Sequence, residues 1–138
     1  MDERDGKGLT DGSKAKVKQL FKINLEGATD ISGMDGISAA KVAVPKVLFL
    51  DIVSVLTANG YTADQIPAKI EGVTFGPDVK LNGRATHTLW VANDNDFDQD
   101  FGGVPNSNPN QIWVFGFTDA ELVGSKLEPQ MHTPPFEW

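Results

Sequence analysis

Apolar and polar residues alternate with a period of two along much of this chain, which predicts β-strands rather than amphipathic helices. In Lys16–Leu25 the odd-numbered apolar residues fall on one face and the lysines on the other, so we expect a half-exposed strand with the apolar face inward. Val44–Ile52 is apolar on both faces, which predicts a buried strand. Three further short strands are predicted, at Gly72–Phe75, Thr88–Asn93 and Gln111–Phe117.

The segments between these strands show loop and turn signals. Val53–Asn59 predicts a helical turn that ends at Gly60, since glycine is the usual residue just past a helix. Segments rich in Gly, Pro, Asn and Asp predict irregular connections: Asp5–Ser13, Glu26–Ile37 and Phe101–Asn110. The tail Gly124–Trp138 contains three prolines and no periodicity, and we expect it to lie over a surface.

The strands form two blocks of similar plan, which predicts an all-β, mostly antiparallel single domain over residues 1–138. Each block resembles part of a β-propeller blade of four strands. The first block contains a strand end at Met1–Arg4, and the second lacks a fourth strand after Gln111–Phe117. We therefore expect roughly two blades with irregular connections and a short helical turn. Closed propellers need about four to eight blades, so the chain is expected to form a homo-oligomer or to belong to a larger propeller.

The charge of the chain narrows the range of partners. It carries 12 Lys and Arg against 19 Asp and Glu, a net charge of −7. This balance argues against nucleic acid or an anionic membrane as partner, because both attract clustered basic residues. The first residues contain no apolar stretch, so we expect no signal peptide on this chain. The longest apolar run, Val47–Leu56, is interrupted by Asp51 and is too short to span a bilayer.

An acidic cluster follows the predicted strand Thr88–Asn93. Four aspartates and two asparagines lie within the eight residues Asn93–Asp100, and their carboxylates repel one another unless a cation or solvent neutralises them. The cluster is not an EF-hand: with Asp94 at position 1, Gln99 and Pro105 stand where Gly and Glu are required. Two interpretations remain, a shallow calcium site that uses Asp94 or Asp96, and a solvated turn.

Other polar and aromatic residues have two interpretations each. Glu71, at the start of a strand and next to Gly72, fits a calcium ligand or a general base, or else a glutamate that holds neighbouring blades together. Arg84 follows the hairpin signature Asn82-Gly83 and is expected to face solvent. We expect the two histidines, His87 and His132, to be structural, because neither has a partner at ligand spacing. We expect four aromatic residues to belong to the core, because they fall on strands: Trp90, Trp113, Phe115 and Phe117.

Five motifs in this order resemble the C-terminal part of the esterase-like phytase family: DERDGKG, GATDIS, KIEGVTFGPD, ANDNDF and NQIWVFGF. The resemblance covers about residues 2–122. It implies a phytase-like β-propeller that belongs to proteins of the bacterial cell exterior or periplasm. Because that family is longer than this chain, the chain is expected to begin well inside it.

The resemblance also implies a function, a calcium-assisted phosphoric ester hydrolase acting on a phosphorylated small molecule. Glu71, Lys69 and Arg4 would then be the catalytic residues, because Lys69 and Arg4 lie in family-like motifs and their charges suit a phosphate. Glu71, Asp94 and Asp96 would be the calcium ligands. The alternative is a non-catalytic propeller segment that serves binding or assembly. The absence of a G-x-S-x-G motif argues against serine esterase chemistry.

Overall fold

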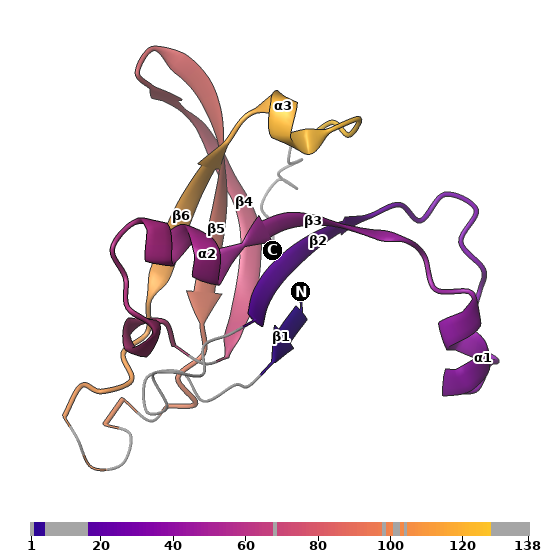
Figure 1. Cartoon of the computed structure of the whole chain (residues 1–138), viewed down its shortest axis with the longest axis horizontal. Coiled ribbons are helices and arrows are strands. Elements are labelled where there is room, and N and C mark those ends of the chain that lie inside the picture. Colours follow the sequence, from indigo (N-terminus) through magenta and orange to yellow (C-terminus); the bar gives the residue numbers. More distant parts are fainter. Residues whose placement is uncertain are drawn as a thin grey trace, which may run out of the picture.

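The computed structural model describes residues 2–4, 17–67, 69–97, 99–100, 103 and 105–127. They form two antiparallel three-stranded sheets (Figure 1). Sheet A has the order β1 (Asp2–Arg4), β2 (Val17–Ile23), β3 (Lys46–Asp51), and sheet B the order β4 (Ile70–Leu81), β5 (Arg84–Asn93), β6 (Ile112–Phe117). The helices are α1 (Gly36–Lys41), α2 (Ile52–Ala58), the 3-10 helix η2 (Ala63–Gln65) and α3 (Asp119–Leu122). The predicted fold class, mostly antiparallel β with two blade-like sheets, is confirmed.

The hairpin between β4 and β5 turns at Asn82 and Gly83, whose φ angles are +50° and +77°. Positive φ at both central residues is typical of the type I′ turn that an Asn-Gly pair favours, so the predicted turn is confirmed. β4 is longer than the predicted strand, however, because it continues past Phe75 to Leu81. A register shift between Gly76 and Val79 accommodates Pro77, which has no N–H to donate.

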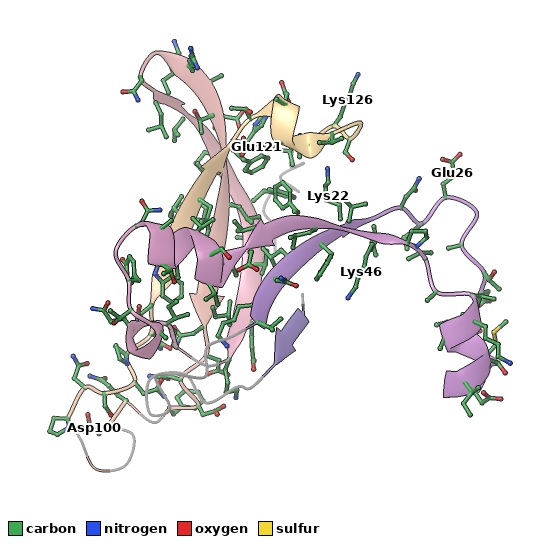
Figure 2. The ribbon with its side chains drawn as sticks, in the orientation of Figure 1. Lys22, Glu26, Lys46, Asp100, Glu121 and Lys126 are labelled. Atoms are coloured by element: carbon green, nitrogen blue, oxygen red, sulfur yellow. The ribbon has the colours of Figure 1, made fainter. Side chains whose placement is uncertain are left out.

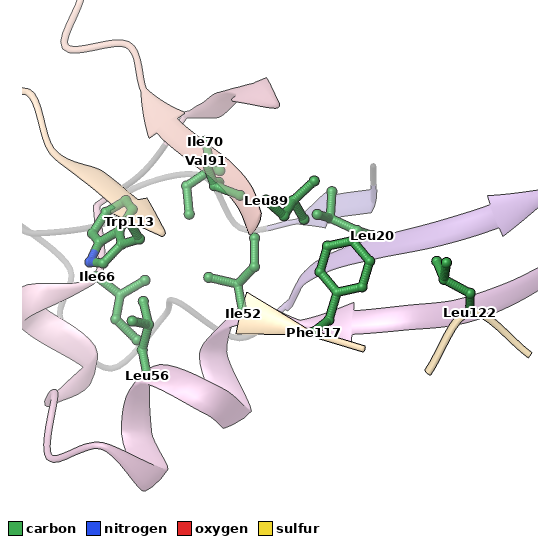
Figure 3. Packing of buried hydrophobic residues seen from close by; sticks show 10 residues of the cluster. All are labelled: Leu20, Ile52, Leu56, Ile66, Ile70, Leu89, Val91, Trp113, Phe117 and Leu122. Atoms are coloured by element: carbon green, nitrogen blue, oxygen red, sulfur yellow. The ribbon is translucent and has the colours of Figure 1, made fainter. Parts of the chain in front are cut away.

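The hydrophobic core lies between the two sheets and α2 (Figure 3). Its buried members come from both sheets, from the segment between them and from α3: Leu20, Ile52, Leu56, Ile66, Ile70, Leu89, Val91, Trp113, Phe117 and Leu122. The T-shaped contact between Phe49 and Phe117, with ring centroids 5.3 Å apart, links the last residues of β3 to β6. Lys22 of β2 (Figure 2) also joins the layers, because its ammonium group donates to the carbonyl oxygen of Leu122.

The helical turn predicted before Gly60 is α2. Asp51 caps its start by accepting a hydrogen bond from the Ser54 backbone N–H at 2.9 Å, and a second from the Gln19 side chain at 2.8 Å. Burial would raise the pKa of the Asp51 carboxyl, but these hydrogen bonds outweigh burial and lower that pKa. Gly60 follows the helix with φ of +90°, as predicted for the residue past a helix end.

Two burial predictions in sheet A are wrong. In β2, Lys18 and Leu20 are buried while Ile23 is 56% exposed, the reverse of the predicted face. In β3, Val47 and Leu48 are exposed rather than buried. The reason is visible in Figure 1, where β2 and β3 extend past sheet B as a long arm, so their outer residues have no layer opposite them. A register shift between Leu20 and Phe21 also changes which residues face inward.

The arm ends in a short helix that was not predicted, and only its first two residues, Gly36 and Ile37, fall within the predicted irregular connection. α1 begins after Asp35, whose carboxylate accepts a hydrogen bond from the Ser38 backbone N–H at 2.8 Å. None of the residues of α1 is buried. Among the described residues, no helix has the length and apolar character needed to cross a membrane.

The aromatic residues of sheet B divide between its two faces. Trp113 and Phe117 are buried and Phe115 is partly buried, which confirms three of the four core predictions. Trp90 is 40% exposed, because it lies opposite Val114 on the face of the sheet that points away from the core. Its indole covers Gly76, where a Cβ atom would stand 2.2 Å from Nε1. The glycine therefore leaves the space that the indole occupies.

Candidate functional site

The predicted polar residues meet at one end of sheet B. β4 and β5 are antiparallel, so the first residue of β4, Ile70, lies opposite the last residue of β5, Asn93. Just beyond this pair, the Asp94 backbone N–H donates to the Lys69 carbonyl oxygen at 2.9 Å. This pairing brings the segment that begins at Lys69 beside the acidic loop. We refer to Lys69, Glu71, Asp94 and Asp96 as the strand-end cluster.

Lys69 stands at the centre of the strand-end cluster. Its backbone has a φ of +55°, a conformation that non-glycine residues seldom adopt. Its ammonium group donates a hydrogen bond to Asp96 Oδ1 and lies 3.7 Å from Glu71 Oε1. The hydrogen bond to Asp96 is the main cause that raises the pKa of Lys69; partial burial opposes it, and the charges of Asp96, Glu71 and Asp94 add to it. Lys69 is therefore fully protonated at neutral pH.

The asparagines and the aspartates of the acidic loop have different structural roles. Asn93 and Asn95 are buried and hold the loop together: Asn93 Oδ1 accepts from the Gln111 backbone N–H at 2.6 Å, and Asn95 Nδ2 donates to the Asn108 carbonyl at 3.1 Å. Asn108 Nδ2 donates back to the Asn95 carbonyl at 3.2 Å. Asp94, Asp96 and Asp100, the aspartates of this loop that the structure describes, are exposed instead. The loop is thus built by amide hydrogen bonds that present carboxylates to solvent.

Asp94 and Asp96 also shape the local backbone. Asp94 Oδ1 accepts from the Asp96 backbone N–H at 2.8 Å, a turn in which the side chain replaces a backbone acceptor. Asp96 and Phe97 both have positive φ, +54° and +61°. This turn sets the Asp96 carboxylate against the Lys69 ammonium group. The exposed turn matches the predicted solvated turn, and the cation beside it is the Lys69 ammonium group rather than the predicted calcium ion.

The strand-end cluster does not form a ready calcium site from the residues that the structure describes. Calcium takes six to eight oxygen ligands, and no group of three or more His, Asp or Glu side chains in the described part of the chain is placed to hold one ion. Two of the predicted ligands, Glu71 and Asp96, already face the Lys69 ammonium group. The described residues of this cluster therefore do not fit a resident calcium ion.

The two arginines lie away from these contacts or outside what is described. Arg84 is at the hairpin end of sheet B, opposite Leu81, so it stands at the other end of β4 from Lys69 and is exposed, as predicted. Arg4 is the last residue of β1 and lies opposite Val17 in sheet A. The side chain of Arg4, like all of His132 and Asp98, lies outside the described residues.

His87 has partners that the sequence did not indicate. Its Nδ1 lies 2.8 Å from Asp78 Oδ1, and its Nε2 lies 3.1 Å from Asp119 Oδ1. The hydrogen bonds to Asp78 and Asp119 raise the pKa of His87. The prediction that His87 lacks a partner is wrong, because Asp78 lies in the irregular part of β4 and Asp119 begins α3. Its contacts tie α3 to sheet B.

Comparison with known proteins places most of the chain in one family. Residues 1–97 match the family model described as phytase-like, esterase-like activity of phytase. The chain belongs to the phytase-like family. The match includes all five sequence-predicted site residues and the whole strand-end cluster, whereas β6 and α3 lie beyond it. No curated protein and no solved structure matches the chain.

Proposed function

We propose that this chain takes part in the hydrolysis of a phosphoric ester, with the strand-end cluster as the place where the phosphate meets the protein. The observation that carries the proposal is the Lys69 ammonium group, which Glu71 and Asp96 hold at the end of sheet B within the segment that matches the phytase-like family. Strand ends and the loops beyond them are where enzymes commonly place reacting groups, because a rigid sheet positions them.

The roles that we propose follow from the chemistry of the side chains. Lys69 would exchange its hydrogen bond to Asp96 for one to a phosphate oxygen, where an ammonium group offsets the charge that develops during transfer. Glu71 would accept a proton from the attacking water, since its carboxylate is half-exposed and lies beside Lys69. Arg4 would add a second positive charge to the phosphate, as the resemblance implies.

The charge of the cluster explains why hydrolysis would need assistance. Three carboxylates surround one ammonium group, so the cluster is negative overall and repels a phosphate. Additional positive charge is required, and calcium is the source that the family resemblance implies. Since the described residues do not form a site for the ion, we assign calcium no geometry. We expect only that its presence reduces the repulsion.

Hydrolysis of p-nitrophenyl phosphate, measured with and without calcium, tests this proposal. We expect turnover that increases with calcium, and a higher KM in Lys69→Met because the phosphate loses its ammonium partner. Lys80→Met is the matched control, since Lys80 is an exposed lysine near the hairpin end of β4. Equal KM values for the wild type and Lys69→Met would show that Lys69 does not contact the phosphate.

A second function, as an assembly or binding segment, is favoured by a different observation. In the described part of the chain, β6 pairs with β5 on one side and with no strand on the other. An open strand edge is a template for another strand. We propose assembly as the alternative role of the chain, either between copies or within a larger propeller.

A further inference from the structure

The outer edge of β6 carries backbone groups that point away from sheet B. The Asn93 backbone N–H donates to the Gln111 carbonyl at 3.3 Å, so Gln111 directs its backbone groups toward β5. In an antiparallel pair this direction alternates along the strand, and β5 and β6 pair without a register shift. Ile112, Val114 and Gly116 therefore direct their N–H and C=O groups outward. Within the part of the chain that the structure describes, no other group receives them.

A groove runs beside this edge. It has a volume of about 680 Å³, and every residue of β6 lines it. Its other wall comes from α2 and the residues on either side, among them Leu50, Leu56 and Tyr61. Apolar walls next to unpaired backbone groups are the features that bind an added β-strand, because the backbone supplies hydrogen bonds and the walls receive alternate side chains.

The edge lacks the features that protect strand edges from pairing. Natural edges carry charged residues, proline or bulges, whereas Ile112–Phe117 contains no charge and no proline. Glu121 is the one carboxylate among the residues that line the groove, and it already accepts hydrogen bonds from the Thr118 N–H and hydroxyl groups, at 2.8 and 3.0 Å. The strand itself is uncharged, so the same strand of a second copy can pair with it without like charges meeting between the two strands.

We propose that two copies of this chain pair through β6, antiparallel and with a two-fold axis at Val114. In this register Val114 lies opposite Val114 of the partner subunit, and Ile112 lies opposite Gly116 of the partner subunit. The outward N–H and C=O groups of each strand then meet the outward C=O and N–H groups of the other, so the edge is complementary to itself. The result is one continuous sheet across both copies.

The side chains fit the same register. Ile112 and Val114 are 65% and 52% exposed on the outer face of the sheet, where Gly116 has no side chain. Gly116 places no side chain of its own opposite the Ile112 side chain of the partner subunit, which meets instead the Thr86 and Leu81 side chains that lie over this glycine. The two valines contact each other across the axis. Pairing thus covers apolar surface that the single chain exposes. A second copy therefore accounts for the absence of charge on β6, for its outward backbone groups and for the sizes of its side chains.

Molar mass measured by light scattering across a micromolar concentration series tests the pairing. We expect a dimer of twice 14.9 kDa. Val114→Pro removes an outward N–H that the fold does not use, so it should leave a folded monomer, with circular dichroism as the check on folding. Val114→Thr keeps that N–H and is the matched control, which should remain dimeric. A wild-type chain that is monomeric throughout, or a dimer unaffected by Val114→Pro, would overturn the proposal.

Disulfide trapping supplies a second test that does not depend on the proline variant. The chain contains no cysteine, so Val114→Cys introduces a single thiol at the proposed axis. Under mild oxidation we expect covalent dimers to form at least tenfold faster than in Val123→Cys, whose side chain is exposed outside β6. Equal rates for the two variants would contradict pairing at Val114. Neither test involves hydrolysis, so its outcome is independent of the proposed function.

Discussion

Replacing Glu71 with glutamine is expected to lower phosphoester hydrolysis by about 100-fold or more, the usual contribution of a general base. Glutamine has nearly the same size and keeps a hydrogen-bonding oxygen near Lys69, but it cannot accept a proton from water. The effect should fall on kcat rather than KM, because the amide still accompanies Lys69. Steady-state values of kcat and KM for the wild type and the variant check this.

Glu26→Gln is the matched control for this prediction. Glu26 is an exposed carboxylate on the arm, far from sheet B in Figure 2. The same change of charge there should leave hydrolysis unaltered. If Glu71→Gln retained the wild-type kcat, Glu71 would not be the base, and the result would favour the alternative in which Glu71 holds neighbouring blades together.

The second large effect concerns His87 and the dependence of stability on pH. The imidazolium form donates both ring N–H groups, one to Asp78 and one to Asp119, whereas the neutral ring has one N–H. The pKa of His87 is therefore raised in the folded chain above the unfolded value. Stabilisation is then complete below the unfolded pKa, near 6.5, and is lost as pH rises through the folded pKa.

Denaturant unfolding of the wild type and His87→Gln at several pH values checks this. The wild type should be more stable than the variant at pH 5.5, and the difference should shrink steadily above pH 6.5. Asp119→Asn removes one of the two negative charges beside the imidazolium and should reduce the same difference without affecting the Asp78 contact. A difference that stays constant from pH 5.5 to 8.5 would show that protonation of His87 does not stabilise the fold.

Much of the fold could be predicted from local signals. The short apolar runs at Thr88–Asn93 and Gln111–Phe117 identified two strands of sheet B. The structure buries one face of each strand against the core. Asn82-Gly83 identified the hairpin, and Gly60 the end of α2, since each needs a backbone conformation that few residues adopt. These features depend on residues that are close in the sequence, and they can therefore be predicted from it.

Burial in sheet A could not be predicted in the same way. The alternation in β2 has the right period, but Lys18 faces inward and Ile23 outward. Which face is covered depends on the position of the other sheet, and the register shift after Leu20 changes it along the strand. The prediction that Trp90 lies in the core is wrong for a related reason. A large aromatic side chain can cover a glycine on the outer face of a sheet as well as fill a core.

The residues of the candidate site were predicted from the sequence, but the contacts between them were not. Lys69, Glu71, Asp94 and Asp96 were all named from the sequence, and the pairing of Ile70 with Asn93 brings their segments together. The hydrogen bond between Lys69 and Asp96 joins residues 27 positions apart and depends on positive φ at both. His87 was missed because Asp119 lies 32 positions away, beyond the reach of any spacing rule.

The central claim is that a phosphate meets the protein at the strand-end cluster, where Lys69 supplies the ammonium group. Two-dimensional ¹H–¹⁵N spectra recorded during titration with phenyl phosphate, first without and then with calcium, test it most directly. The account predicts shifts concentrated at Lys69–Gly72 and Asp94–Phe97, larger with calcium present and lost in Lys69→Met. Shifts absent from both segments, or centred instead on the hairpin at Arg84, would contradict it.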